Sequence, residues 1–155
     1  MPKNFGRTIN RIVIHCTGTS QTATVEQIKN YWRNVLGWSN PGYSYIIGVN
    51  GERHLLQNLS KTTNGVKGYN HDSVHISYIG GLKGDDRTDE QKEAMIKLLK
   101  ELTNEAMLGN IPIVGHRDLS PDKNKDGKIT SNEWVKLCPS FDVKEWLKEI
   151  NFYNT

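Results

Sequence analysis

Short, β-branched apolar runs alternate with amphipathic helical segments along this chain, and this alternation restricts the fold more than any other feature of the sequence. Strands are predicted at residues 11–16, 43–49, 53–57, 74–79 and 111–114, with a hairpin turn at Asn50-Gly51. Helices are predicted from residue 24 to about 35, from 88 to roughly 107 and from 142 onward. Because strands interleaved with helices are typical of a sheet covered by helices, we predict a single α/β domain over residues 1–155, with a central mixed β-sheet flanked by helices.

Each expected helix begins at a residue whose side chain can cap it. Thr24 precedes Gln27 by three positions, and Thr88 precedes Gln91 in the same way, so both pairs are capping boxes. Asp142 is a third candidate cap. The apolar residues that recur at helical spacing after the first two caps are predicted to face the core: Val25, Ile28, Trp32 and Val35, then Met95, Leu98, Leu99 and Leu102.

The composition argues against several kinds of partner and location. The net charge is only +3 and the lysines are spread along the chain, so we expect no nucleic-acid partner. No apolar stretch approaches the length of a membrane span, so we expect no membrane insertion. The first apolar run is too short for a secretory signal, which predicts cytoplasmic synthesis without a signal peptide. Two cysteines do not make a disulfide framework, and we expect a reduced pair, with a single cystine as the alternative. We also expect a monomer.

Two histidines and a cysteine lie where predicted strands end or loops begin. His15 closes the first strand, His116 follows the last strand, and Cys138 directly precedes Pro139. Imidazoles and a thiolate are good zinc ligands, and three protein ligands leave the fourth position open for water, as in catalytic sites. Their spacing matches no short zinc motif, however. Taken singly, each histidine is more often an ordinary polar residue and the cysteine a small buried one, so both readings stay open.

A second metal site is indicated by the polar segment at about residues 120–134. The segment from Asp122 to Glu133 fits the calcium-loop pattern D-x-[DN]-x-[DN]-G-x5-E at every fixed position. Ser120-Pro121 directly before it disfavours an entering helix, so we predict an EF-hand-like loop and not a full EF-hand. The alternative is a solvated polar loop without an ion. The predicted calcium ligands are Asp122, Asn124, Asp126, Lys128 through its backbone carbonyl, and Glu133.

Several segments, in this order, resemble one known family. They are residues 12–20 (IVIHCTGTS), 42–47 (GYSYII), 67–71 (KGYNH), 80–81 (GG), 115–118 (GHRD) and 138–142 (CPSFD). Together they resemble the type-2 N-acetylmuramoyl-L-alanine amidases, which include the phage lysozymes of this type and are related to the peptidoglycan recognition proteins. The resemblance spans about residues 8–150, and the segment at about residues 120–134 then looks like an insertion.

The resemblance implies an activity and a set of site residues. The activity is zinc-dependent hydrolysis of the amide bond between N-acetylmuramic acid and L-alanine in bacterial peptidoglycan. By the same resemblance the zinc ligands are His15, His116 and Cys138, while Tyr43 and Lys136 are catalytic. His71 falls where the phage lysozymes line their substrate groove. The proton acceptor stays open between Tyr43 and water.

Other functions and contexts remain open at this point. The first alternative is a noncatalytic peptidoglycan-binding module, which all three filled ligand positions disfavour. The second is a phage regulator that binds RNA polymerase. A phage endolysin, a prophage remnant and a secreted toxin all fit a chain without a leader, which would reach the wall by phage-type release or non-classical export. His54 and His75 match no ligand position and are predicted to be structural or surface residues, and Cys16 is predicted to lie in the core.

Overall fold

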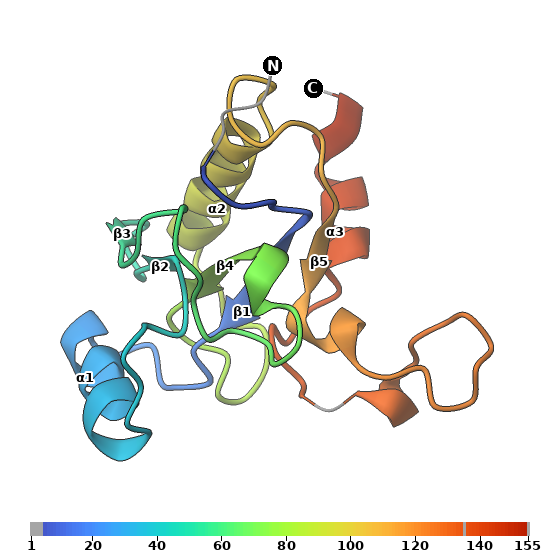
Figure 1. The fold of residues 1–155 in the computed structure, drawn as a ribbon. Helices are drawn as coiled ribbons and strands as arrows, with labels where there is room; N and C mark the ends of the chain where they lie inside the picture. Colours follow the sequence, from blue (N-terminus) through green and yellow to red (C-terminus); the bar gives the residue numbers. More distant parts are fainter. Residues whose placement is uncertain (1–4, 135, 155) are drawn as a thin grey trace.

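The computed structural model describes residues 5–134 and 136–154, which form a five-stranded mixed sheet with helices packed against it (Figure 1). The strand order is β3-β2-β4-β1-β5. The β2, β4, β1 and β5 strands are parallel, and the edge strand β3 runs antiparallel to β2. The α/β fold predicted from the sequence is therefore confirmed. The strands are β1 (Arg11–Cys16), β2 (Tyr45–Ile47), β3 (Arg53–Leu55), β4 (Ser73–Tyr78) and β5 (Ile113–Gly115).

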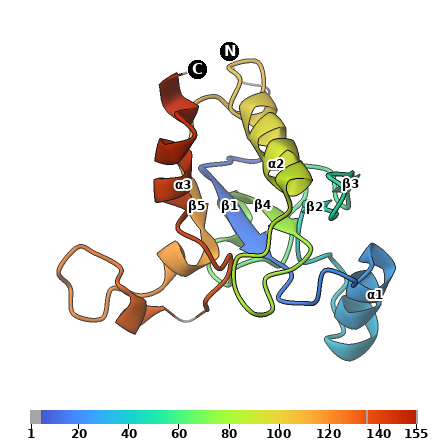
Figure 2. The ribbon, with the colours of Figure 1, turned by 180° about the vertical axis from the view of Figure 1, so that it is seen from behind.

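The described residues form three α-helices, and each begins at its predicted cap. They are α1 (Val25–Asn30), α2 (Asp89–Leu102) and α3 (Val143–Glu149). The hydroxyl groups of Thr24 and Thr88 accept the amide protons of Gln27 and Gln91, and each glutamine side chain accepts the amide proton of its threonine in return. The α2 and α3 helices lie on the same side of the sheet, which is clear in the view from behind (Figure 2).

Alternation along β1 separates a packed face of the sheet from the face that carries the site. Ile12, Ile14 and Cys16 belong to one apolar cluster with the inner sides of α2 and α3. Cys16 is 5% exposed, so its predicted core position is confirmed. His15 is equally buried but points to the opposite face, which is covered by the loop before β4 and the short 3-10 helix at Asn70–Asp72. The buried His15 side chain is therefore separated from the main apolar core by the sheet.

One predicted helix end and one predicted core position were wrong. The α2 helix ends at Leu102 and not near Met107, because the Asn104 side chain accepts the amide proton of Ala106 and favours a turn over further helix. After α1 the chain continues as a π-helical turn, Tyr31–Val35. The wider turn changes the angular position of its last residues, and Val35 is 65% exposed although it was predicted to face the core.

The polar segment between β5 and α3 leaves the body of the protein as an extended loop, the orange loop of Figure 1. Its described residues form two short 3-10 turns, His116–Leu119 and Ser131–Glu133, and otherwise have no regular structure. Within residues 5–134 and 136–154, no helix has both the length and the apolarity that a membrane span requires.

Candidate metal centre

The candidate metal centre lies at the carboxyl ends of the adjacent parallel strands β1 and β5. His15 is the penultimate residue of β1, and His116 follows the last residue of β5. Ile14 pairs with Gly115 in the strand register, which brings the next residue of each strand to the same edge of the sheet. The centroids of the two imidazole rings lie 4.9 Å apart. Carboxyl ends of parallel strands are where α/β sheets commonly bind ligands.

Cys138 reaches this edge from a segment far along the chain. Its carbonyl accepts the amide proton of Arg117 at 2.9 Å, and the next carbonyl, that of Pro139, accepts the Tyr78 hydroxyl proton at 2.7 Å. The Cys138 Sγ accepts the amide proton of Cys16 at 3.1 Å. These bonds tie the segment to β1, to β4 and to the turn after β5, and they hold the sulfur beside His15.

The three predicted zinc ligands are brought close together by the fold. One ligand atom from each of His15, His116 and Cys138 lies within 4.8 Å of the others. The Cys138 Sγ is 3.7 Å from the His15 Nδ1. Ordinary zinc–sulfur and zinc–nitrogen bonds at a tetrahedral angle place such atoms about 3.6 Å apart. The donor set and its spacing therefore fit zinc.

Burial sets the protonation of these side chains. It lowers the pKa of His15 well below its usual range, and the nearby His75 and His116 lower it further. Burial, with the Lys136 charge, lowers the pKa of His116 to about 4. Both imidazoles are therefore neutral at pH 7 and offer a lone pair. Burial raises the pKa of the Cys138 thiol, so a cation that binds this sulfur must displace its proton.

Tyr43 lies against the first ligand. Its ring centroid is 4.9 Å from that of His15 and 5.4 Å from that of Trp32. The hydroxyl group donates a hydrogen bond to the carbonyl of Cys16 at 3.3 Å. Burial, and then the nearby thiols of Cys138 and Cys16, raise the pKa of Tyr43. The phenol therefore keeps its proton at neutral pH and is a hydrogen-bond donor beside the site.

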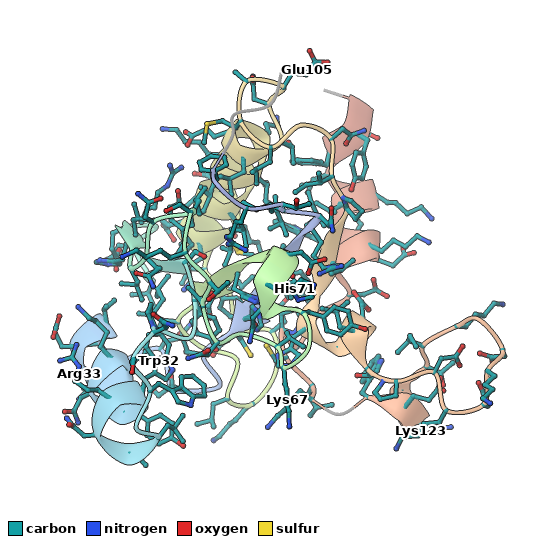
Figure 3. The ribbon with its side chains drawn as sticks, viewed as in Figure 1. Trp32, Arg33, Lys67, His71, Glu105 and Lys123 are labelled. Carbon is teal, nitrogen blue, oxygen red and sulfur yellow. The ribbon has the colours of Figure 1, made fainter. Side chains whose placement is uncertain are left out.

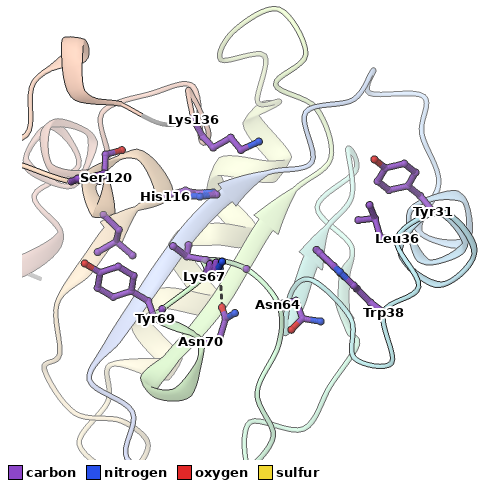
Figure 4. Close-up of a pocket in the computed structure, with 15 residues that line it drawn as sticks. Tyr31, Leu36, Trp38, Asn64, Lys67, Tyr69, Asn70, His116, Ser120 and Lys136 are labelled. Atoms are coloured by element: carbon purple, nitrogen blue, oxygen red, sulfur yellow. Dashed lines mark hydrogen bonds between the residues drawn. The ribbon is translucent and has the colours of Figure 1, made fainter. Parts of the chain in front are cut away.

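Lys136 is exposed and lies over the rim of the centre, above His116 in Figure 4. A cavity of about 1050 Å³ opens on one side, with Tyr31, Leu36 and Trp38 on its far wall. A second cavity of about 640 Å³ opens on the other side, between Cys138 and the Gly81–Gly84 turn. Both cavities are lined by His116 and Lys136. The two cavities therefore meet at His116 and Lys136.

The remaining histidines lie in three different environments. His71, the predicted substrate residue, has an exposed side chain whose Nε2 lies 3.6 Å from Asp72 (Figure 3). Its neighbours Tyr69 and Asn70 line the larger cavity. His54 is in the edge strand β3, away from the centre. His75 is fully buried, and its Nδ1 lies 2.8 Å from the Nε2 of His15.

Sequence reasoning therefore missed the contact that His75 makes with a predicted ligand. The contact depends on the register of β4 against β1, in which His75 pairs with Val13. Both histidines occupy odd positions of their parallel strands and so point to the same face. The sequence therefore did indicate which face each histidine occupies, but this predicts a contact only once the two strands are known to be neighbours.

The predicted calcium ligands also lie close together. Asp122, Asp126 and Glu133 each offer a carboxylate oxygen within 4.8 Å of the others. The Asp122 Oδ2 accepts the amide proton of Gly127 at 2.8 Å, whereas its buried Oδ1 has no hydrogen-bond partner among the described residues. Glu133 is 4% exposed and accepts the amide proton of Asn124 at 3.3 Å. Glu133 is therefore buried inside the loop and Asp122 half-buried, whereas Asp126 is exposed to the solvent.

Comparisons with known proteins agree with this geometry. The family described as N-acetylmuramoyl-L-alanine amidase matches residues 5–128. An endolysin of Klebsiella phage KP32 is 31% identical over 144 residues, which cover 88% of this chain and 84% of the endolysin. The N-acetylmuramoyl-L-alanine amidase endolysin LysCS of Clostridium intestinale has the same fold, with a TM-score of 0.71 at 20% identity over 97% of this chain and 89% of LysCS. The same holds for the complex of the peptidoglycan recognition proteins LCa and LCx with tracheal cytotoxin, with a TM-score of 0.73 at 24% identity over 96% of this chain and 86% of the matched chain. The chain belongs to the N-acetylmuramoyl-L-alanine amidase family.

Proposed function

We propose that this protein is a zinc-dependent amidase that hydrolyses the bond between N-acetylmuramic acid and L-alanine in bacterial peptidoglycan. The observation that carries the proposal is the convergence of His15, His116 and Cys138 within 4.8 Å, at a centre that is open to cavities on two sides. Three protein ligands leave a coordination position for water, which distinguishes a catalytic site from a structural one. Membership of the amidase family and the phage endolysin relative support the same reaction.

The side chains around the centre have separate roles in this proposal. Zinc, when bound, lowers the pKa of a water molecule to about 7 and polarises the scissile carbonyl. Lys136 places its positive charge at the rim, where it stabilises the negative charge that develops on the carbonyl oxygen. Tyr43 keeps its proton and donates it to the carbonyl of Cys16, so its hydroxyl oxygen can accept a hydrogen bond from the attacking water and orient it, but the phenol does not serve as the base. Water therefore becomes the favoured proton acceptor.

Peptidoglycan is the proposed partner, and the cavities support an extended ligand. The larger cavity has an aromatic and aliphatic wall made by Tyr31, Leu36 and Trp38, which suits the apolar face of a sugar ring. A neighbour of the same fold binds tracheal cytotoxin. His71 is retained as a proposed substrate residue on the loop that forms the opposite wall. In this setting the protein acts on the cell wall, as phage endolysins do.

A noncatalytic binding module is the alternative, since peptidoglycan recognition proteins share the fold. The complete set of metal donors favours the enzyme, because binding of the polymer does not require a buried thiol beside two neutral imidazoles. Lys136 also has no salt-bridge partner among the described residues, which leaves its charge available to a substrate.

We propose further that the loop at about residues 120–134 binds calcium. The sequence pattern supplies oxygen donors at the required positions, and the carboxylates of Asp122, Asp126 and Glu133 lie within 4.8 Å of one another. Asn124 and the carbonyl of Lys128 complete the proposed ligand set. The unpaired, buried Oδ1 of Asp122 supports the proposal, because a bound cation would satisfy it.

Digestion of purified peptidoglycan tests the main proposal. The zinc-loaded protein is expected to release free stem peptides and leave the glycan strands intact, which mass spectrometry of the products distinguishes. The His116→Ala variant is the matched control, because it removes one donor and should abolish zinc binding and digestion together. New reducing sugar ends would indicate a glycosidase, and binding of the polymer without product would indicate the recognition module.

A further inference from the structure

A chain of short hydrogen bonds connects the loop before β4 to the predicted ligand His15. The amide of Val66 donates to the side-chain Oδ1 of Asn70 at 2.8 Å (Figure 4). The same Oδ1 lies 2.9 Å from the Nε2 of His75. The Nδ1 of His75 in turn lies 2.8 Å from the Nε2 of His15. The three side chains linked by these hydrogen bonds, those of Asn70, His75 and His15, are wholly or partly buried.

The backbone amide of Val66, the first donor in this series, determines which ring nitrogen of each histidine carries the proton. An amide N–H can only donate, so the Asn70 atom that it meets is the carbonyl oxygen. His75 must then donate to this oxygen from Nε2, which leaves its Nδ1 as an acceptor in the neutral ring. His15 donates to that acceptor from Nε2. The lone pair of His15 therefore lies on Nδ1, the atom that faces the Cys138 sulfur at 3.7 Å.

We propose that His75 and Asn70 are positioning residues that hold His15 in the single tautomer and ring orientation in which Nδ1 can bind the metal. The inference rests on the proposed zinc site and names the groups that prepare its most buried ligand. A histidine that binds a metal through one nitrogen usually donates its other N–H to a fixed acceptor. Here the acceptor is another imidazole, which can serve only because Asn70 holds it in the matching tautomer.

Two features of the structure restrict the positions of the His75 ring and of Asn70. A Cβ atom at Gly65 would lie 2.4 Å from both Cγ and Nδ1 of His75, so the ring occupies space that any other residue at position 65 would fill. The guanidinium group of Arg7 donates to the carbonyls of Leu59 and Ser73, at 2.9 and 3.0 Å. These bonds fasten both ends of the loop that carries Asn70.

Zinc affinity, measured by competition with a chromophoric chelator, tests the inference in variants of the full chain. His75→Phe keeps a ring but removes the acceptor, and Gly65→Ala displaces the ring without removing any polar group. Both are expected to weaken zinc binding about 10–100-fold. His75→Asn returns an amide oxygen near the place of Nδ1 and should recover part of this loss. His54→Phe, the same substitution in the edge strand, should leave the affinity unchanged.

The wild-type protein supplies a second readout that does not depend on whether a variant folds. Nitrogen-15 spectra of the zinc-loaded protein should show protons on the Nε2 atoms of His75 and His15, with His15 bound through Nδ1. A proton on the Nδ1 of His75, or unchanged zinc affinity in folded His75→Phe and Gly65→Ala proteins, would overturn the inference and leave the proposed function standing. A wild-type protein that binds no zinc would instead overturn the proposed function, and the inference with it.

Discussion

At the scale of single residues, burial determines how the side chains of the candidate metal centre are charged when no metal is bound. The pKa values of His15 and His116 are lowered, so neither imidazole carries a positive charge that would repel a cation at pH 7. The pKa of Cys138 is raised, so the sulfur is a thiol until a metal displaces its proton. The amide of Cys16 donates to this sulfur and can stabilise the thiolate that results.

Zinc binding near neutral pH should therefore release about one proton per metal. The proton comes from Cys138, whose folded pKa lies above neutral pH, and not from the histidines, since His116 is already neutral above a pKa of about 4. Zinc affinity should accordingly rise with pH through the neutral range. Titration calorimetry in buffers of different ionisation enthalpy measures the released protons. Release of none would contradict the assignment of Cys138 as a ligand.

Replacement of Lys136 should separate catalysis from metal binding. Lys136→Ala is expected to keep its zinc and to lose about 10²–10³-fold in turnover, the usual cost of removing one group that stabilises a developing oxyanion. Lys144→Ala, at an exposed lysine on α3, is the matched control and should be fully active. Zinc content and the rate of stem-peptide release are measured on the same samples. An unchanged rate in Lys136→Ala would remove this lysine from the mechanism.

At the scale of elements, local sequence signals determine where the helices begin. Tertiary contacts determine how much each helix start contributes to stability. Both threonine capping boxes form the same two reciprocal hydrogen bonds. Thr88 makes one further bond, because its hydroxyl group donates to the carbonyl of Val49 at 2.7 Å. Gln91, in the same box, is fully buried and donates to the carbonyls of Ile47 and Ile79. The start of α2 is thereby attached to the ends of β2 and β4.

The two caps should consequently differ in what their loss costs. Thr24→Ala is expected to lower the free energy of unfolding by about 1 kcal/mol, the usual cost of losing a helix cap. Thr88→Ala loses the additional bond to Val49 as well and should cost about 2 kcal/mol. Urea unfolding of the two variants beside the wild type gives both values. Equal losses would show that the bond to Val49 contributes nothing to stability.

At the scale of the whole molecule, the candidate metal centre joins three segments that are remote in the chain. His15 is contributed by β1, His116 by the turn after β5, and Cys138 by the segment that follows the extended loop. Glu133 ends the loop's last short turn, five residues before Cys138 in the sequence. Ordering of the extended loop therefore limits the freedom of the segment that supplies both the sulfur and Lys136.

Calcium should accordingly raise the melting temperature of the protein. A ligand that binds only the folded state at 100 times its dissociation constant adds about 2.7 kcal/mol to the free energy of unfolding. Asp126→Ala removes one proposed ligand and should abolish the increase. Glu105→Ala, which changes an exposed glutamate outside the loop, should keep it. Thermal melts with and without calcium measure the effect. Equal melts of the wild-type protein, with no heat of binding in calorimetry, would refute the calcium site.

The sequence by itself determined the local structure and the chemical inventory of this protein. Short β-branched apolar runs predicted the strands, helical spacing predicted the helices, and the capping boxes predicted the starts of α1 and α2, because these signals depend on residues a few positions apart. His15, His116 and Cys138 were predicted as a set, and the fold brings them together. The end of α2 was wrong by several residues, because the turn at Asn104 competes with the helix.

Only the tertiary structure decided how His15 is held. His75 was predicted to be a structural or surface residue, and nothing near it in the chain indicates otherwise. Its contact with His15 exists because β4 lies beside β1 in one register and because Gly65, on a covering loop, leaves room for the ring. Strand register and loop position arise from the packing of segments remote in sequence. A hydrogen bond between two such segments has no local pattern from which it could be predicted.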